Sequence, residues 1–217
     1  MISRIGHIKS FRERALSNVV MILEHPFLII EQIVACRGTE LVFTYSRYQV
    51  AQPGLQAAAP RSPIVRVPGR DLTAAWLADR FAELGAAEEM AWHSRVECRG
   101  ITYHIPMIDF VNRPTRSVLC ELGRALVTEV GLDGHFVFFD TGQSFHGYLP
   151  DLISEDTWLR YLGRLLLLNE HDGPPVIDTR WVGHALMRGF AALRWSHNTN
   201  RYLAPPRLVS ACEPSGL

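Results

Sequence analysis

The sequence lacks net charge, because 22 basic residues balance 22 acidic residues in a chain of 217. A strong global field for nucleic acid is therefore excluded, and any such binding must depend on a local patch. Lysine is nearly missing as well, since Lys9 is the only one. The remaining basic residues are arginines, which suit two-point contacts to phosphate, although a bias in genome composition would give the same count.

Cysteine is scarce and scattered. Cys36, Cys98, Cys120 and Cys212 lie far apart and form no Cys-x-x-Cys pair. This spacing argues against a disulfide framework and against a clustered zinc site. It is typical of a protein whose thiols are reduced.

Long apolar runs are absent too. No run approaches the roughly 18 residues that a membrane-spanning helix needs. The N-terminal stretch MISRIGHIKSFRERALSNVV is too charged to be a secretory signal peptide. We therefore expect a soluble, cytoplasmic protein that makes no contact with a membrane.

Apolar segments without an internal repeat make up the first part of the chain. Their spacing predicts helical structure over residues 10–36, interrupted near Pro26, and a strand over 41–48. Residues 51–63 are rich in Ala, Pro and Gln, which predicts a linker or a long loop. A further helix is expected to begin at an Asp71 cap. We expect a single domain over 1–217, with an N-terminal α/β segment at 1–60 and a core at 62–217.

The second half of the chain is more regular. It predicts a strand over 101–112, a helix over TRSVLCELGRALVTEVG and a strand over HFVFFD. A strand, a helix and a strand in about 40 residues fit a βαβ-like unit. Further helices are expected to begin at Ser154 and close to Thr179. The segments together predict an α+β fold with a well-covered sheet.

Polar residues stand at the ends of three apolar segments. Asp109 lies within MIDFV, Ser144 and His146 lie within TGQSFH, and Asp178 ends VID. Each residue alone has an ordinary explanation: Asp109 could cap a turn, His146 could be a hydrogen-bonded structural histidine, and Asp178 could cap the helix that follows. Their order and spacing indicate more than any one of them does.

A basic segment follows these motifs. No acidic residue occurs from Thr179 to Cys212, whereas this stretch contains several basic groups. These are Arg180, His184, Arg188, Arg194, His197, Arg201 and Arg207. Such segregation in a neutral protein creates a positive face suited to phosphate, provided that the side chains converge. Arg194, just after the predicted helix, is the residue that we expect to face inward.

The order of these motifs resembles the catalytic core of the archaeo-eukaryotic primase superfamily, the primase-polymerases. MIDFV is similar to the first motif of that family, TGQSFH to the second and VID to the third. The segment LRWSHNTNRY is similar to a later arginine-containing loop. The resemblance covers about residues 96–210. It implies a core with an RRM-like mixed sheet and flanking helices.

The resemblance also implies roles for single residues. Asp109 and Asp178 would bind Mg²⁺ or Mn²⁺, and together with His146 they would be catalytic. Ser144, His146 and Arg194 would bind the incoming nucleoside triphosphate, together with His197 of the arginine-containing loop. The expected partners are nucleoside triphosphates and DNA or RNA.

One position departs from the family pattern. The second aspartate of the first motif should fall at position 111, where this chain has Val111. The sequence is similar here to a bacterial primase-like branch from conflict and defence genes that has a single aspartate in this motif. Two functions therefore remain open: a primase-polymerase-like nucleotidyltransferase, acting in defence or repair, and a catalytically impaired module that binds nucleotides or nucleic acid.

Two unrelated functions also remain. A phosphoesterase could use His146 and His197 as an acid-base pair. Two-histidine phosphoesterases, however, have His before Ser or Thr, whereas this chain has Ser144 before His146. A generic partner-binding domain is the last alternative, because the first 60 residues show no recognisable chemistry.

Overall fold

The computed structural model of the protein describes residues 24–50 and 63–209. Residues 10–23 of the helical structure predicted over 10–36, and residues 51–62 of the loop predicted over 51–63, lie outside the described residues. Within the described ranges, no helix combines the length and the apolar character needed to cross a membrane.

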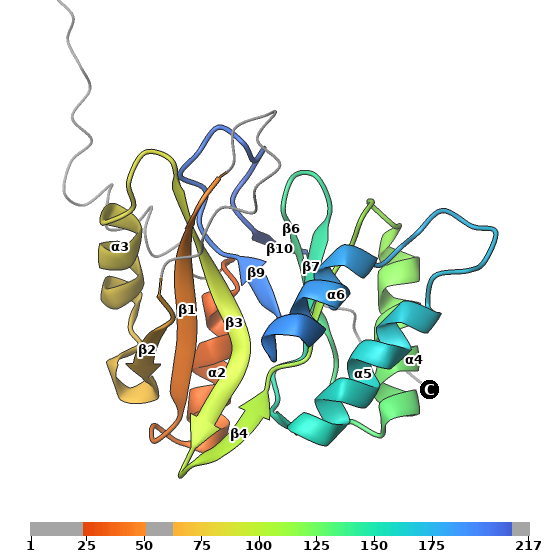
Figure 1. The fold of residues 1–217 in the computed structure, drawn as a ribbon, viewed down its shortest axis with the longest axis horizontal. Helices are drawn as coiled ribbons and strands as arrows, with labels where there is room; N and C mark the ends of the chain where they lie inside the picture. The colour runs from red at the N-terminus through yellow and green to blue at the C-terminus, as the bar shows by residue number, and fades with distance from the viewer. Residues whose placement is uncertain (1–23, 51–62, 210–217) are drawn as a thin grey trace, which may run out of the picture.

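The described strands form two sheets in which neighbouring strands are antiparallel (Figure 1). Their bounds are β1 Val42–Gln49, β2 Val65–Pro68, β3 Glu88–Cys98, β4 Ile101–His104, β5 Met107–Asp109, β6 Val137–Asp140, β7 Phe145–Tyr148, β8 Ile153–Ser154, β9 Ala192–Arg194 and β10 Arg207–Val209. The first sheet has the order β2-β1-β3-β4-β8, and β9 also pairs with β3. The second has the order β10-β6-β7-β5.

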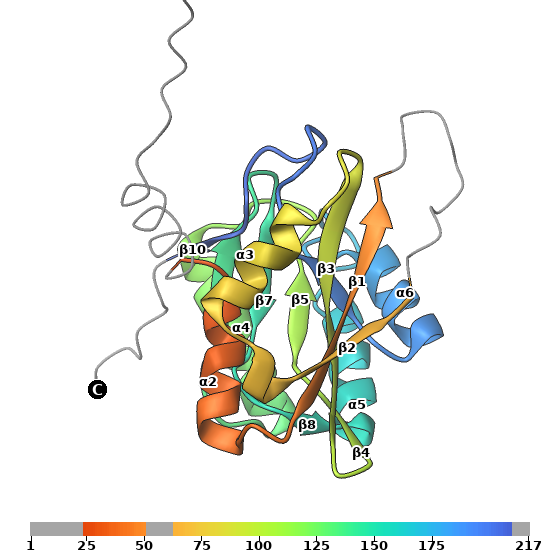
Figure 2. The same cartoon turned by 90° about the vertical axis from the view of Figure 1, so that its left-hand side faces the viewer.

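Helices flank both sheets. Their bounds are α2 Phe27–Arg37, α3 Ala74–Ala82, α4 Arg116–Val130, α5 Glu155–Leu167 and α6 Thr179–Arg188, and a short 3₁₀ turn, η1, spans Gly69–Asp71. The helices α2 and α6 lie on opposite sides of the strands (Figure 2). The predicted α+β class is therefore confirmed.

Side-chain caps start most of these helices. Thr115 accepts a hydrogen bond from the amide of the third residue after it, and so does Ser154, as predicted for α5. The predicted cap at Asp71 is wrong, because Asp71 lies in η1 and Thr73 caps α3 instead.

The predicted βαβ-like unit exists in a split form. Both β5 and β6 are antiparallel to β7, which lies between them, so β5 and β6 run parallel without being neighbours. The helix α4 connects them. The prediction of one strand over 101–112 is wrong, because β4 and β5 belong to different sheets. The chain changes sheet at Ile105 and Pro106, and proline has no amide hydrogen for a ladder bond.

One hydrophobic cluster includes side chains of both sheets and of α2. At its centre the rings of Trp92 and Trp195 stack with centroids 4.3 Å apart. Cys36 and Cys98 have free thiols, whereas Cys120 is disulfide-bonded. The expectation that all thiols are reduced is therefore corrected at Cys120, and Cys212 lies outside the described residues.

Candidate active site

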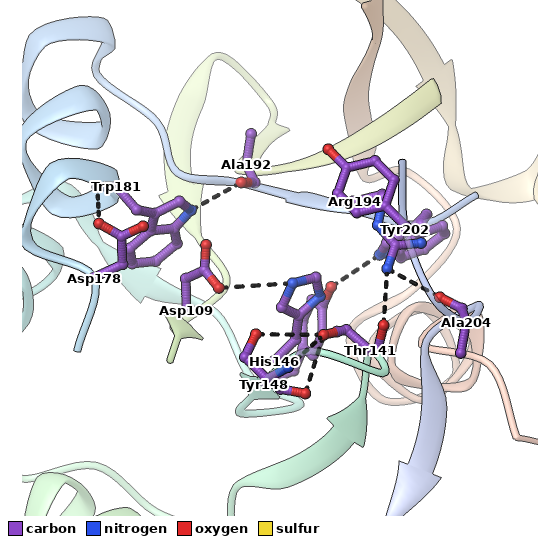
Figure 3. Close-up of polar contacts among 12 residues, drawn as sticks. Asp109, Thr141, His146, Tyr148, Asp178, Trp181, Ala192, Arg194, Tyr202 and Ala204 are labelled. Carbon is purple, nitrogen blue, oxygen red and sulfur yellow. Dashed lines mark hydrogen bonds and ion pairs between the residues drawn. The ribbon is translucent and has the colours of Figure 1, made fainter. Parts of the chain in front are cut away.

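The ends of β5 and β7 bring the first two predicted motifs together. Asp109 is the last residue of β5, and the antiparallel register places His146 of β7 directly opposite it. Residues paired in this way project on the same face of a sheet. The distance from His146 Nε2 to Asp109 Oδ1 is 3.7 Å (Figure 3).

The third motif joins this pair through the backbone. The amide of Asp178 donates to the carbonyl oxygen of Asp109 at 3.0 Å, next to an isolated bridge between Phe110 and Ile177. The side chain of Asp178 caps α6, since its Oδ1 accepts from the amides of Arg180 and Trp181 at 2.8 and 3.0 Å. Asp178 is thus a helix cap and also a neighbour of Asp109.

Arg194, at the end of β9, is buried with 7% of its surface exposed. Its guanidinium donates to three backbone carbonyls, those of Ser196, Thr141 and Ala204. The ring of Tyr202 lies 4.1 Å from its central carbon (Figure 3). Among the described residues, no carboxylate forms an ion pair with it. A buried cation that contacts only dipoles and a ring is well placed to receive an anion.

Ser144 lies in the tight turn between β6 and β7. Its amide donates to the hydroxyl of Thr141 at 3.2 Å, and its carbonyl accepts from the Thr141 amide at 3.0 Å. Asp140, an acidic residue at the start of this turn, forms a two-point ion pair with Arg113. It also accepts a hydrogen bond from the Gly142 amide. Asp140 therefore holds the hairpin and does not replace the carboxylate that is missing at position 111.

All the predicted site residues except His197 line one cavity of about 380 Å³. This first cavity is lined by Asp109, Ser144, His146, Asp178 and Arg194, with Tyr48, Val111, Trp181 and Tyr202 among its other walls. His197 is exposed, and its Nε2 bonds to the carbonyl of Tyr202 at 2.9 Å. It holds the loop that carries Tyr202 and does not reach His146, so the acid-base pair of the phosphoesterase hypothesis is not formed.

Burial dominates the electrostatics of this cavity. It raises the pKa of Asp109 to about 8, with a further rise from the nearby Asp178 and an opposing effect of Arg194. Burial and the charge of Arg194 lower the pKa of His146 to about 3. The imidazole is therefore neutral at pH 7, and its Nδ1 is a buried atom without a hydrogen-bond partner among the described residues.

The donor set suits one hydrated divalent cation better than a cage made by the protein. Among the described residues, no group of three or more His, Cys, Asp or Glu side chains could hold a metal ion. The site offers the carboxylates of Asp109 and Asp178, and the half-exposed Val111 supplies no third one. Mg²⁺ commonly binds through one or two carboxylates, keeps several waters and completes its shell with substrate phosphates.

Sequence reasoning missed three aromatic walls of the cavity. The hydroxyls of Tyr48 and Tyr202 lie 3.0 Å apart, and the indole of Trp181 donates to the carbonyl of Ala192 at 2.8 Å. Tyr48 ends an ordinary-looking strand, so no local signal marks it. Tyr202 follows Arg201 in the segment LRWSHNTNRY. Its position in this arginine-containing loop is the sequence feature that could have identified it as a wall of the cavity.

The family described as archaeo-eukaryotic primase 1D-like matches residues 68–207. The chain belongs to this archaeo-eukaryotic primase-like family. The resemblance found in the motifs is thereby confirmed for the family and for its α+β fold. This primase-like match begins well before the first motif, at the end of β2, and extends to the start of β10. Comparisons with curated proteins and with solved structures found no match.

Proposed function

We propose that this primase-like protein is a nucleotidyltransferase that joins a nucleoside triphosphate to a nucleic acid. The 3′ hydroxyl of the strand would attack the α-phosphorus, and pyrophosphate would leave. One observation carries the proposal: a single cavity is lined by residues from three separate motifs and by a buried arginine that has no ion pair with a described residue. Its volume of about 380 Å³ lies in the usual range for small-molecule sites.

The triphosphate would bind at the end of the cavity that holds Arg194. The guanidinium is fixed by three carbonyls, so little conformational entropy is lost when a phosphate binds to it. Ser144 would donate its hydroxyl to a phosphate oxygen, and the neutral His146 would donate one ring N–H. His197 would act indirectly, through its bond to the Tyr202 carbonyl.

Asp109 and Asp178 would hold one Mg²⁺ or Mn²⁺ ion together with phosphate oxygens. When bound, such an ion would supply positive charge that offsets the negative charge of the phosphates. Burial, followed by the charge of Asp178, raises the pKa of Asp109 and disfavours its ionised form. A cation bound between Asp109 and Asp178 would offset both effects and favour the ionised carboxylates.

A binding module with impaired catalysis is the second candidate, and Val111 favours it. The side chain at this position is about half exposed and lines the cavity, so a carboxylate would fit there, yet none is present. Membership of a single-aspartate bacterial branch with a role in defence would agree with this reading.

Primer-extension and de novo synthesis assays with Mg²⁺ and Mn²⁺ separate the two candidates. The variants are Asp109→Ala and His146→Ala, and Arg160→Ala serves as an exposed control outside the cavity. The transferase predicts incorporation by the wild type and the control, and loss of incorporation in both site variants. Triphosphate binding that depends on His146, without incorporation by the wild type, would support the binding module. If the wild type shows neither incorporation nor triphosphate binding, the assignment of the site is refuted.

A further inference from the structure

A second cavity of about 380 Å³ adjoins the first on the side of α6. The two share Asp109, Asp178, Tyr48 and Tyr202 as walls, so they meet at the carboxylate pair. The remaining walls of the second cavity come largely from α6, with further residues from the end of β1, from Phe190 and Ala192, and from Arg201 in the loop after β9. The proposed function above leaves this space without a ligand.

Basic side chains dominate the second cavity. Arg180, His184 and Arg188 follow one another at four-residue spacing along α6, and residues so spaced lie on one face of a helix. Arg201 adds a fourth basic group from the loop. The eight steps along the helix from Arg180 to Arg188 correspond to a rise of about 12 Å. The row is therefore extended, and it fits a chain of phosphates better than one compact anion.

No carboxylate among the described residues forms an ion pair with the arginines of this row. Arg180, Arg188 and Arg201 are exposed, and none of them has an ion pair with another described residue. The acidic residues that line the cavity are Asp109 and Asp178, at its inner end. Other arginines of the protein, such as Arg66 with Glu97 and Arg164 with Glu129, do have carboxylate partners.

Aromatic rings accompany the basic row. Tyr48, Trp181, Phe190 and Tyr202 all line the second cavity. Basic grooves with aromatic side chains are typical of sites for single-stranded nucleic acid, where arginines contact phosphates and rings stack on bases. The hydrogen-bonded Tyr48 and Tyr202 form a wall common to both cavities.

We propose that the second cavity binds the sugar-phosphate backbone of a single nucleic-acid strand and leads its end toward Asp109 and Asp178. This inference rests on the proposed function for the direction of the strand. Its binding residues, however, are Arg180, Arg188 and Arg201, which the triphosphate site does not use. The phosphates of a second nucleoside triphosphate have the same chemistry, and the experiment has to distinguish the two sources.

The test measures binding of a fluorescent single-stranded oligonucleotide, as DNA and as RNA, by anisotropy without nucleotide or divalent cation. The double variant Arg180→Ala/Arg188→Ala is compared with Arg70→Ala/Arg160→Ala, which removes the same charge from exposed residues outside both cavities. The helix cap is not at risk, because Asp178 bonds to the backbone amide of Arg180. Circular dichroism checks the fold of both variants.

The cavity variant is expected to bind the oligonucleotide about tenfold more weakly or worse, and the control to bind like the wild type. The slope of log affinity against log salt should become shallower by about 1.4, at roughly 0.7 per lost phosphate contact. Affinity for a fluorescent ATP analogue should not change.

Equal oligonucleotide affinity in the two double variants would overturn the inference. So would a loss of affinity for the ATP analogue alone, which would identify a second nucleotide subsite. Failure of the proposed function gives a different result: oligonucleotide binding would still depend on the α6 arginines, while the wild type incorporates no nucleotide.

Discussion

Gly142 combines two constraints at the tip of the hairpin between β6 and β7. Its φ of +89° is a conformation that residues with a Cβ rarely adopt. A Cβ built there would lie 2.8 Å from Leu203 Cβ and 3.0 Å from the Ala204 amide nitrogen. The carbonyl of Ala204 accepts a hydrogen bond from Arg194. The hairpin tip therefore helps to fix the loop that orients the buried guanidinium.

Replacing Gly142 with alanine is expected to lower the free energy of unfolding by about 2 kcal/mol, because it adds backbone strain and a steric clash. It should also weaken triphosphate binding, since Ala204 must move. Gly163→Ala is the matched control: Gly163 is exposed in α5 with nothing within 4 Å of its Cβ position, so alanine should be neutral or stabilising by up to about 1 kcal/mol. Urea unfolding and nucleotide titrations measure both effects, and equal behaviour of the two variants would contradict this account.

At the scale of residues, the sequence predicts polar groups that belong to an ordered motif and misses those that act through distant contacts. Glu89 is an example of the second kind. It is fully buried, and it accepts hydrogen bonds from the Ser196 hydroxyl and from the amides of Asn198 and Thr199. Its partners follow it by more than a hundred positions, and the local sequence EEMAW looks like an exposed strand start. No local pattern could identify Glu89 as the anchor of this loop.

The helix α6 depends on Asp178 for its start, and the proposed cation site depends on the same side chain. These roles need different chemistry. Capping requires a side-chain oxygen that accepts from the amides of Arg180 and Trp181, and asparagine supplies one as well as aspartate does. Binding of a cation requires the negative charge. Two substitutions can therefore separate the roles.

Asp178→Asn is expected to keep the free energy of unfolding within about 0.5 kcal/mol of the wild type, whereas Asp178→Ala should lose about 1 kcal/mol with the cap. Both should abolish cation-dependent incorporation of nucleotides. Thermal unfolding and the primer-extension assay provide the two readouts. If the asparagine variant kept its activity, Asp178 would be a structural cap and not a cation ligand.

The elements that the sequence predicts correctly have a clear period or a clear boundary. The strand β1 and the helix α4 are of this kind, and Gly131 ends α4 in a left-handed conformation. The long strand β3 was not predicted, because polar residues such as His93 and Ser94 are buried within it and interrupt the apolar pattern. Its burial comes from strands on both sides, which a single segment of sequence does not reveal.

At the scale of the whole molecule, buried histidines connect distant segments in their neutral form. His25 Nδ1 accepts from the amide of Phe27 at 3.1 Å, so its Nε2 must donate to the carbonyl of Trp195 at 2.9 Å. His104 stacks on Trp158 with ring centroids 4.0 Å apart. Burial lowers the pKa of both histidines to about 4. Protonation is therefore easier in the unfolded chain than in the folded protein.

The protein should lose stability as the pH falls from about 6.5 toward 4. Because the folded-state pKa values of His25 and His104 lie below the unfolded value, their contribution is fully present above pH 6.5 and is lost on acidification. Each histidine should account for on the order of 3 kcal/mol by pH 4. Asp109 opposes this trend, since its raised pKa favours the folded state at lower pH.

His104→Phe isolates one of these contributions. The variant keeps a ring against Trp158 but cannot take up a proton, so its stability should fall less steeply with pH, by up to about 1.4 kcal/mol per pH unit. Urea unfolding at several pH values between 7.5 and 4.5 measures the slope. Parallel curves for the variant and the wild type would show that His104 does not couple folding to protonation.

The pairing of Asp109 with His146, and of His146 with Phe139 of β6, limits how the length of the chain can change. Removing one residue from the turn at 141–144 without a compensating bulge would put Gly147 in the place of His146 and turn the imidazole toward the other face. The same shift would put Tyr148 in the place of Gly147, where a Cβ would lie 3.0 Å from the Phe138 ring and 3.3 Å from Ile108 Cβ. Insertions and deletions in this turn should therefore be tolerated in pairs of residues, since an even change preserves which side chains face the cavity.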